Sequence, residues 1–154
     1  MKTLARHLLA ELYGSSHDAL DDLDRVRDAL RDGVRAIGAT PLGETFHRYA
    51  PQGVSGTIVI AESHLSIHTW PESSYAALDI FTCGGLDPRP GFEVIGRALG
   101  AERVRVQEVL RGLAEEVAEA GPIGPDDIIV LARTTEELPL RPCTENARDE
   151  ESVR

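Results

Sequence analysis

Four strand-length runs follow one another between residues 40 and 83, and they limit the fold more than any other feature of this sequence. Prolines and glycines, which are typical of turns, separate the runs. The runs are Thr40 to Tyr49, Gly56 to Ala61, His64 to Trp70 and Tyr75 to Cys83, and Pro51, Pro71 and Gly84 punctuate them. Because short connections join antiparallel neighbours, the sequence predicts an antiparallel sheet.

Amphipathic helices are predicted on both sides of these runs. The first has Ser16 or Asp18 placed to cap its start and Gly38 placed to end it. Its apolar residues recur at helical spacing and are Leu20, Leu23, Val26, Leu30, Val34 and Ile37. The second helix opens at Asp87-Pro88, and its apolar side consists of Phe92, Ile95 and Leu99.

Two further segments have strand character. Arg103 to Leu110 alternates apolar and polar residues, and Leu4 to Tyr13 fits either a helix or a strand, of which the resemblance described below favours the strand. Helices that precede and follow a run of antiparallel strands typically pack together on one face of the sheet. We therefore expect an α/β two-layer sandwich with a mainly antiparallel sheet.

The chain length of 154 residues suits one domain rather than two. We expect this domain to cover residues 1–132, with a short helix at Leu113 to Ala120 and an edge strand at Ile128 to Leu131. Residues 133–154 combine proline and mixed charge without periodicity, so they are expected to form a loose tail.

The formal net charge is −10, and no patch is rich in lysine or arginine. Nucleic-acid and anionic-membrane surfaces need clustered positive charge, so neither partner is expected, and a small-molecule substrate is favoured. The N-terminal region has no long apolar run, so it predicts no signal peptide or membrane span and a cytoplasmic location. Cys83 and Cys143 are expected to be reduced there, which leaves Cys83 free for chemistry.

The segment from Glu62 to Trp70 has the most unusual composition for a strand. Side chains alternate along a strand, so His64, Ser66, His68 and Trp70 would share one face, and Ser63, Leu65, Ile67 and Thr69 the other. A half-buried strand rarely carries two histidines on one face. An antiparallel hairpin through Pro71 is expected to bring Cys83 near His68.

Two chemical interpretations use the histidines directly. In the first, His64 and His68 bind zinc with His7 or His47 as a further ligand, but this spacing suits a helix better than a strand, and no metal is expected. In the second, His68 lowers the pKa of the Cys83 thiol and creates a nucleophilic thiolate.

A third interpretation is self-processing at the Glu62–Ser63 peptide bond. The Ser63 hydroxyl would attack the preceding carbonyl, an ester would replace the amide, and elimination would leave a terminal pyruvoyl group. This chemistry needs backbone strain, a donor for the oxyanion and a base. Taken singly, a serine at a strand start is usually a turn residue and a histidine on a strand is usually structural.

Several ordered blocks together resemble the prokaryotic S-adenosylmethionine decarboxylase proenzymes. The strongest blocks are Gly53 to Gly56, Glu62 to Glu72 and Asp79 to Gly84, and the weaker ones are Arg6 to Leu8, Gly38 to Thr40 and Thr45 to Arg48. They span roughly the first three quarters of the chain. An ordered match of this kind is far more specific than any single motif.

The resemblance implies cleavage between Glu62 and Ser63 into fragments of 62 and 92 residues. Ser63 would become a covalent pyruvoyl group that binds the substrate amine as a Schiff base. By the same resemblance, His68 is the base of processing, Ser55 assists processing and Cys83 is the proton donor in turnover. The resemblance also implies a homodimer of processed protomers.

Substrate binding is assigned to Tyr49, Trp70 and Glu72, because an adenosyl group and a sulfonium suit aromatic faces and carboxylates. Tyr49 stands where the family has phenylalanine, and Ser73-Ser74 replaces an aromatic residue or histidine followed by glycine. The same pyruvoyl chemistry acting on L-arginine or L-ornithine is one alternative. An unprocessed regulatory homologue without catalytic activity is the other.

Overall fold

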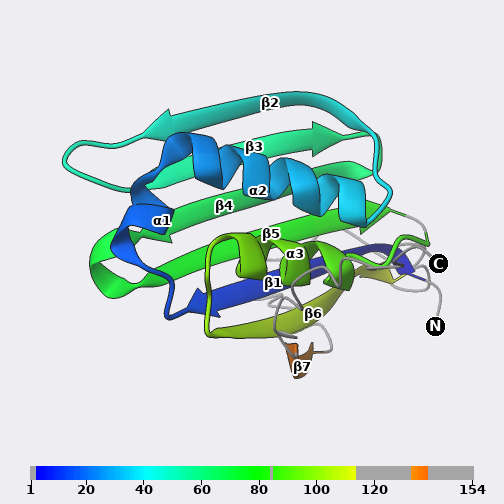
Figure 1. Ribbon diagram of the computed structural model, residues 1–154. Coiled ribbons are helices and arrows are strands. Elements are labelled where there is room, and N and C mark those ends of the chain that lie inside the picture. The colour runs from blue at the N-terminus through cyan, green and yellow to red at the C-terminus, as the bar shows by residue number, and fades with distance from the viewer. Residues whose placement is uncertain (1–2, 84, 114–132, 139–154) are drawn as a thin grey trace, which may run out of the picture.

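The computed structural model describes residues 3–83, 85–113 and 133–138. Within them, an antiparallel seven-stranded sheet has the strand order β2-β3-β4-β5-β1-β6-β7 (Figure 1). The strands are β1 (Thr3–Tyr13), β2 (Pro41–Arg48), β3 (Val54–Ile60), β4 (Ser63–Trp70), β5 (Tyr75–Cys83), β6 (Arg103–Leu113) and β7 (Arg133–Leu138). The helices are α1 (His17–Asp21), α2 (Leu23–Ala36) and α3 (Arg89–Ala98), with a 3₁₀ turn, η1, at Pro71–Ser73.

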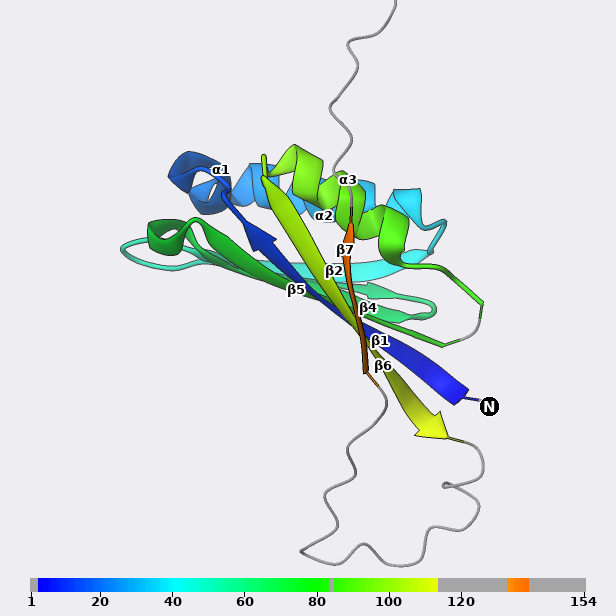
Figure 2. The ribbon, with the colours of Figure 1, turned by 90° about the horizontal axis from the view of Figure 1, so that it is seen from below.

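All three α-helices lie on the same face of the sheet, and Figure 2 shows that the described elements leave the other face open. The core forms between the two layers, where β1, β4 and β5 bury alternate apolar residues against α2 and α3. Leu8, Leu65 and Ile80 from the sheet and Leu30 and Phe92 from the helices are completely buried there. Each such side chain contributes about 1.5–3 kcal/mol. The predicted two-layer α/β sandwich is confirmed.

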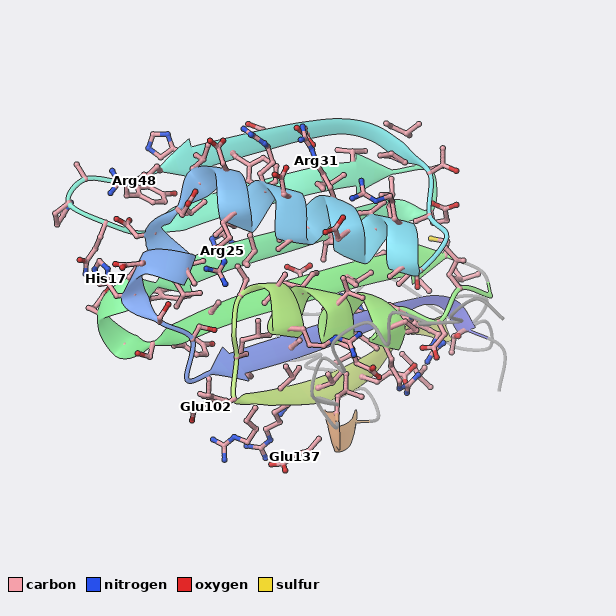
Figure 3. All side chains as sticks on the ribbon, in the orientation of Figure 1. His17, Arg25, Arg31, Arg48, Glu102 and Glu137 are labelled. Carbon is pink, nitrogen blue, oxygen red and sulfur yellow. The ribbon has the colours of Figure 1, made fainter. Side chains whose placement is uncertain are left out.

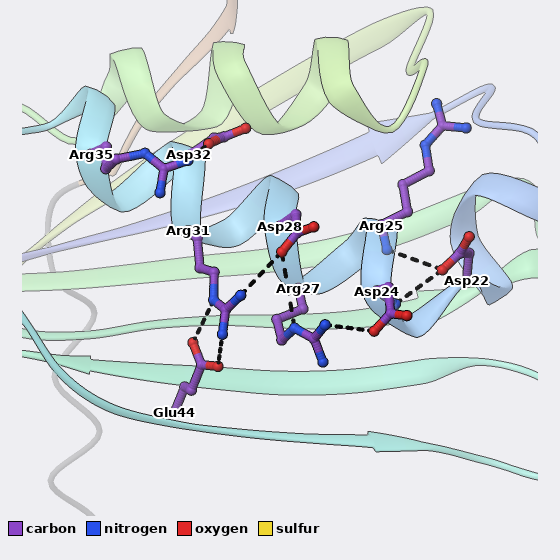
Figure 4. A network of polar contacts seen from close by, with 9 residues as sticks. All are labelled: Asp22, Asp24, Arg25, Arg27, Asp28, Arg31, Asp32, Arg35 and Glu44. Carbon is purple, nitrogen blue, oxygen red and sulfur yellow. Dashed lines mark hydrogen bonds and ion pairs between the residues drawn. The ribbon is translucent and has the colours of Figure 1, made fainter.

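The first predicted helix is confirmed in position but is interrupted at Asp22. Ser16, rather than Asp18, caps α1 by accepting a hydrogen bond from the Ala19 N–H. Asp22 has extended backbone angles and caps α2 by accepting from the N–H groups of Asp24 and Arg25, as Figure 4 shows. An aspartate side chain that accepts from the free N–H groups of a first turn begins a new helix. The single apolar pattern of the sequence therefore runs through two helices, α1 and α2.

Ion pairs fix α2 over the edge strand β2. The Arg31 guanidinium forms a two-pronged pair with the Glu44 carboxylate and also contacts Asp28 (Figure 4). Exposed pairs of this kind contribute little to stability, so their main effect is on the relative position of helix and strand. Apolar burial supplies most of the stability.

Strands from before and after residue 62 alternate in position across the sheet. Strand β1 lies between β5 and β6, and β3 pairs with β4. A chain broken after residue 62 therefore keeps three strand pairs that join its two pieces, namely β3–β4, β5–β1 and β1–β6. Two such fragments cannot separate without dismantling the sheet.

The C-terminal region differs in part from the sequence-based expectation. Arg133–Leu138, the first residues of the predicted tail, form β7 and pair with β6 in an antiparallel register from Val109↔Arg133 to Val104↔Leu138. The rest of that tail, the predicted helix at 113–120 beyond Leu113 and the predicted strand at 128–131 lie outside the described residues. The domain boundary at residue 132 stays a prediction. No helix in the described ranges is long and apolar enough to cross a membrane.

Candidate active site

Strand β4 presents His64, His68 and Trp70 to the open face of the sheet. Leu65, Ile67 and Thr69 are buried beneath the helices, while His68 and Trp70 are exposed on the opposite side. The predicted alternation is confirmed from Leu65 to Trp70, although Ser66 is itself buried. Ser63, which was expected to share the face of Leu65, instead has its hydroxyl beside the His64 ring. Polar side chains on this strand are available for chemistry because the apolar half of the strand alone anchors it in the core.

A tight turn at Ala61–Glu62 joins β3 to β4 and places Ser63 in an unusual backbone conformation. Ile60 and Ser63 are the last paired residues before the turn. Ser63 has a φ of 150°, and Ser74 is the only other non-glycine residue with positive φ in the described part of the chain. Side chains rarely tolerate such angles, which store on the order of 1–3 kcal/mol. The strain lies at the residue that follows the Glu62–Ser63 bond.

The carbonyl group of that bond already has a hydrogen-bond donor. The Cys83 backbone N–H donates to the Glu62 carbonyl oxygen at 3.1 Å. Antiparallel pairing between β4 and β5 creates this contact, because Ser63 pairs with Thr82 and the next residue of β5 lies opposite Glu62. The Cys83 thiol is free and exposed at the same end of the sheet. A donor aimed at a carbonyl oxygen stabilises the negative charge that develops when the carbonyl is attacked.

The Ser63 hydroxyl is connected to a chain of polar groups on the open face. Its Oγ lies 3.3 Å from His64 Nδ1, and His64 Nε2 lies 3.0 Å from Asp79 Oδ2. His7 Nε2 approaches the same carboxylate oxygen at 3.2 Å, and the Ser66 hydroxyl donates to the other oxygen. Burial raises the pKa of Asp79, but the hydrogen bonds from Ser66, His7 and His64 outweigh it and hold the pKa below its usual value. Asp79 is therefore a carboxylate at neutral pH.

The other end of β4 forms a pocket of about 360 Å³. The Ser55 hydroxyl and His68 Nδ1 are 2.7 Å apart at its edge, because Ser55 pairs with His68 across the β3–β4 ladder. The lining residues are Tyr49, Gln52, Gly53, Ser55, His68, Thr69, Trp70 and Glu72. The predicted binding residues and the predicted processing residues Ser55 and His68 thus line one cavity.

The loop between β2 and β3 is held in place at this pocket. The Arg48 Nε donates to the Asp21 carbonyl oxygen at 3.0 Å, and the Asp21 carboxylate accepts from the Gly53 N–H at 2.9 Å. Figure 3 shows Arg48 and His17 at this end of the molecule, where α1 meets the loop. These contacts fix the loop that carries Tyr49, so the aromatic wall of the pocket is formed in advance.

The two groups of residues lie far apart within one chain. Ser63 and His68 are five positions apart on an extended strand, which corresponds to about 16 Å. His68 therefore cannot contact the Ser63 of its own chain. The prediction that Cys83 lies near His68 is wrong. The β4–β5 register places Ala77 opposite His68, and Cys83 lies beyond Ser63 at the other end of the strand.

A cluster with metal-binding potential consists of His7, His64 and Asp79, whose ligand atoms lie within 4.8 Å of one another. His68, the second histidine of the zinc interpretation, is not part of it. Asp79 and His64 lie on different strands, so no local sequence pattern groups them. One signal could have indicated that Asp79 lies on the same face as other polar groups. Asp79 stands between the buried Leu78 and Ile80, so its side chain points away from the core.

Comparisons with known proteins identify the family. The family model for S-adenosylmethionine decarboxylase matches residues 6–112, which is well over half of the chain. The chain belongs to this family.

Relatives and solved structures agree with this assignment. The S-adenosylmethionine decarboxylase proenzyme of Thermotoga maritima is 48% identical over 118 residues, which cover 76% of this chain and 91% of the relative. That of Caldanaerobacter subterraneus is 48% identical over 117 residues, covering 75% and 94%. The crystal structure of adenosylmethionine decarboxylase from Aquifex aeolicus has a TM-score of 0.67 and 34% identity, covering 73% of this chain and 94% of that one.

A more distant structure shows the fold alone. The Trypanosoma brucei AdoMetDC monomer matches with a TM-score of 0.53 and 17% identity, and the match covers 79% of this chain but 53% of that one. This S-adenosylmethionine decarboxylase family member thus corresponds to about half of the trypanosomal chain.

Proposed function

We propose that this chain is a self-processing, pyruvoyl-dependent decarboxylase that converts S-adenosylmethionine to its decarboxylated form for spermidine synthesis. The observation that carries the proposal is the Glu62–Ser63 bond in a chain 48% identical to curated proenzymes. The backbone at Ser63 is strained and the Glu62 carbonyl is hydrogen-bonded to the Cys83 N–H. A histidine also lies beside the Ser63 hydroxyl. Strain, an oxyanion donor and a base are the requirements of this reaction.

Processing converts Ser63 in balanced steps. Ser63 Oγ bonds to the Glu62 carbonyl carbon, the carbon–nitrogen bond breaks, and the hydroxyl proton moves to the released nitrogen. Loss of the Ser63 α-proton to a base then breaks the bond between Cβ and Oγ of residue 63, which frees the Glu62 carboxylate and leaves an enamine at residue 63. The enamine isomerises to an imine, and water releases ammonia and leaves the pyruvoyl group. The strained backbone of Ser63 and the hydrogen bond to the Glu62 carbonyl support formation of the pyruvoyl group at this position.

Once formed, the pyruvoyl carbonyl supplies the electron sink for decarboxylation. The residues of the chain bind the substrate and move protons around it. Trp70 and Tyr49 offer faces for the adenine and the sulfonium, and Glu72 offers a carboxylate to the ribose or the positive charge. Cys83 is exposed and its backbone contacts the Glu62 carbonyl, one residue before position 63, and we assign to its thiol the proton that is donated to the carbon that has lost carbon dioxide.

We further propose that the active form is a homodimer in which each site combines two chains. One protomer supplies Ser63 and Cys83, and its partner supplies Ser55, His68 and the pocket. The separation of about 16 Å along β4 supports this, because the residues of both ends are needed for the chemistry and no single chain brings them together. The open face of the sheet is the surface on which two protomers would meet (Figure 2). In this arrangement, His68 removes the α-proton of the partner chain.

Denaturing mass spectrometry of the purified protein tests the processing proposal. We expect two fragments of 62 and 92 residues, the larger of which begins with a ketone. A single intact chain after prolonged incubation would contradict self-processing and support the alternative of a regulatory homologue. Carbon dioxide release from S-adenosylmethionine, arginine and ornithine, measured in parallel, tests the substrate. The named relatives favour S-adenosylmethionine over the two basic amino acids.

Co-expression of Ser63→Ala and His68→Ala chains tests the shared site. Each variant alone is expected to be inactive, while mixed dimers contain one site with Ser63 and His68 both intact. Random assortment gives roughly a quarter of wild-type activity. No recovery in confirmed mixed dimers would contradict the shared site without affecting the proposed reaction. The cytoplasmic location stays a prediction.

A further inference from the structure

We propose that His64 is the base that takes the Ser63 hydroxyl proton in the acyl shift, and that Asp79 and His7 position its ring. The proposal rests on the proposed self-processing and names the residue that starts it. His64 Nδ1 lies 3.3 Å from Ser63 Oγ, and no other histidine in the described part of the chain is hydrogen-bonded to this hydroxyl. His68, the base implied by the family resemblance, lies too far along β4 to act on Ser63 of its own chain.

Hydrogen bonding fixes which nitrogen of each ring carries the proton. Arg111 has only donors, so the contact at 3.1 Å between its Nη1 and His7 Nδ1 requires that Nδ1 accept. The proton of neutral His7 is then on Nε2, which donates to Asp79 Oδ2. Asp79 is ionised and only accepts, so the His64 proton that faces it is on Nε2 as well. His64 Nδ1 is left with a lone pair directed at the serine.

Packing holds the His64 ring in this orientation. The Phe81 ring stacks on it with centroids 6.0 Å apart and an interplanar angle of 12°. The His7 ring packs against the same phenylalanine with centroids 5.4 Å apart. Both histidines are thus fixed by one aromatic side chain and one carboxylate. A base held by packing and a hydrogen bond loses little freedom when it acts.

In the acyl shift, His64 takes one proton from Ser63 and returns it to Ser63. As Ser63 Oγ bonds to the Glu62 carbonyl carbon, its proton passes to His64 Nδ1, and the imidazolium is stabilised by the Asp79 carboxylate. The carbonyl oxygen becomes negative and is stabilised by the Cys83 N–H. When the carbon–nitrogen bond breaks, His64 returns the proton to the Ser63 nitrogen. His64 is neutral again, and an ester and a free amine remain.

This assignment gives the two histidines of β4 separate steps. His64 acts on the hydroxyl before the ester forms, and His68 of the partner acts on the α-proton after it forms. Hydroxylamine distinguishes these steps, because it cleaves an ester readily and leaves an amide intact. A chain blocked before the shift is resistant to hydroxylamine, and a chain blocked after it is sensitive.

The test follows the uncut fraction over time by denaturing mass spectrometry in freshly purified full-length chains. His64→Ala and the more nearly isosteric His64→Gln are expected to slow cleavage by about 100-fold or more, and Asp79→Asn by about 10-fold. Asp32→Asn changes a partly exposed carboxylate on α2, which covers the opposite face of the sheet, and is the matched control for Asp79→Asn, expected to cut at the wild-type rate. Added imidazole is expected to accelerate cleavage of His64→Ala but not of the control.

The outcomes separate this proposal from the proposed function. Wild-type chains that fail to cut would contradict self-processing itself. Wild-type chains that cut, together with His64→Gln chains that cut equally fast, would overturn only the role of His64. Uncut His64→Ala chains are expected to resist hydroxylamine, while uncut His68→Ala chains are cleaved by it. Equal sensitivity of both variants would place His64 after the shift and overturn the proposal.

Discussion

The two ends of β4 differ in backbone conformation and in what surrounds their side chains. At the Ser63 end, the backbone is strained, the Glu62 carbonyl has a donor and the hydroxyl has a histidine beside it. At the His68 end, the backbone is regular and the side chains line a cavity of about 360 Å³. The first end has the features needed to change a covalent bond. The second has the features needed to bind a molecule.

One strand therefore carries two groups of residues with different properties. A strand extends about 3.3 Å per residue, so residues that are close in sequence on β4 become distant in space. Reactive and binding groups are thereby separated within a chain, which is why we propose that they meet across a dimer.

Removal of the Ser63 hydroxyl should abolish both processing and turnover. Ser63→Ala has no nucleophile for the Glu62 carbonyl and cannot form a pyruvoyl group, so a single uncut chain without decarboxylase activity is expected. Mass spectrometry and carbon dioxide release measure the two effects. Ser73→Ala, at an exposed position of η1, is the control that should cut and turn over normally. Cleavage of the Ser63→Ala chain at residue 62 would contradict the assignment of the nucleophile.

Replacement of Cys83 should separate processing from turnover. Cys83→Ala keeps the backbone N–H that contacts the Glu62 carbonyl, so cleavage should continue. Loss of the proton donor should reduce kcat by about 100- to 10,000-fold. The fraction cut and kcat are to be measured on the same preparation. A kcat equal to that of the wild type would show that the thiol is not the donor.

Truncation of Trp70 should weaken binding and leave processing unchanged. Trp70→Ala removes an aromatic face from the pocket, and loss of about 1–3 kcal/mol of contact raises KM by roughly 5- to 150-fold. Leu42→Ala, which removes another exposed apolar side chain, is the matched control. Steady-state kinetics with S-adenosylmethionine provide the measurement. An unchanged KM would exclude Trp70 from the binding surface.

The smallest expected effect concerns the turn that follows the His68 end. Ser74 has a φ of 49° at a position where the family resemblance places glycine. Ser74→Gly should relieve this left-handed conformation and stabilise the fold by about 0.5–1 kcal/mol, measured by chemical unfolding. Ser73→Gly, where the backbone needs no positive φ, should destabilise slightly. A loss of stability in Ser74→Gly would show that the serine side chain contributes more than its backbone strain removes.

Much of the fold could be predicted because it depends on local patterns. The boundaries of β5 and the apolar face of β4 follow from apolar periodicity. The roles of Ser63, His68 and Cys83, which the family blocks imply, stay predictions. The interruption at Asp22 was missed, because the apolar spacing continues through it and only the capping bonds reveal it. The partnership of His64 with Asp79 and His7 was missed because the three residues lie on three different strands.

Sequence by itself determined the chemistry available to this protein: a serine after Glu62, two histidines on one face of a strand, and a cysteine at the end of the next. Only the tertiary structure decided which of these groups meet. Strand register is set by the turns and by burial of one face, and a different register would pair other residues. That register places the Cys83 N–H on the Glu62 carbonyl, Asp79 within reach of His64, and Ala77 rather than Cys83 opposite His68.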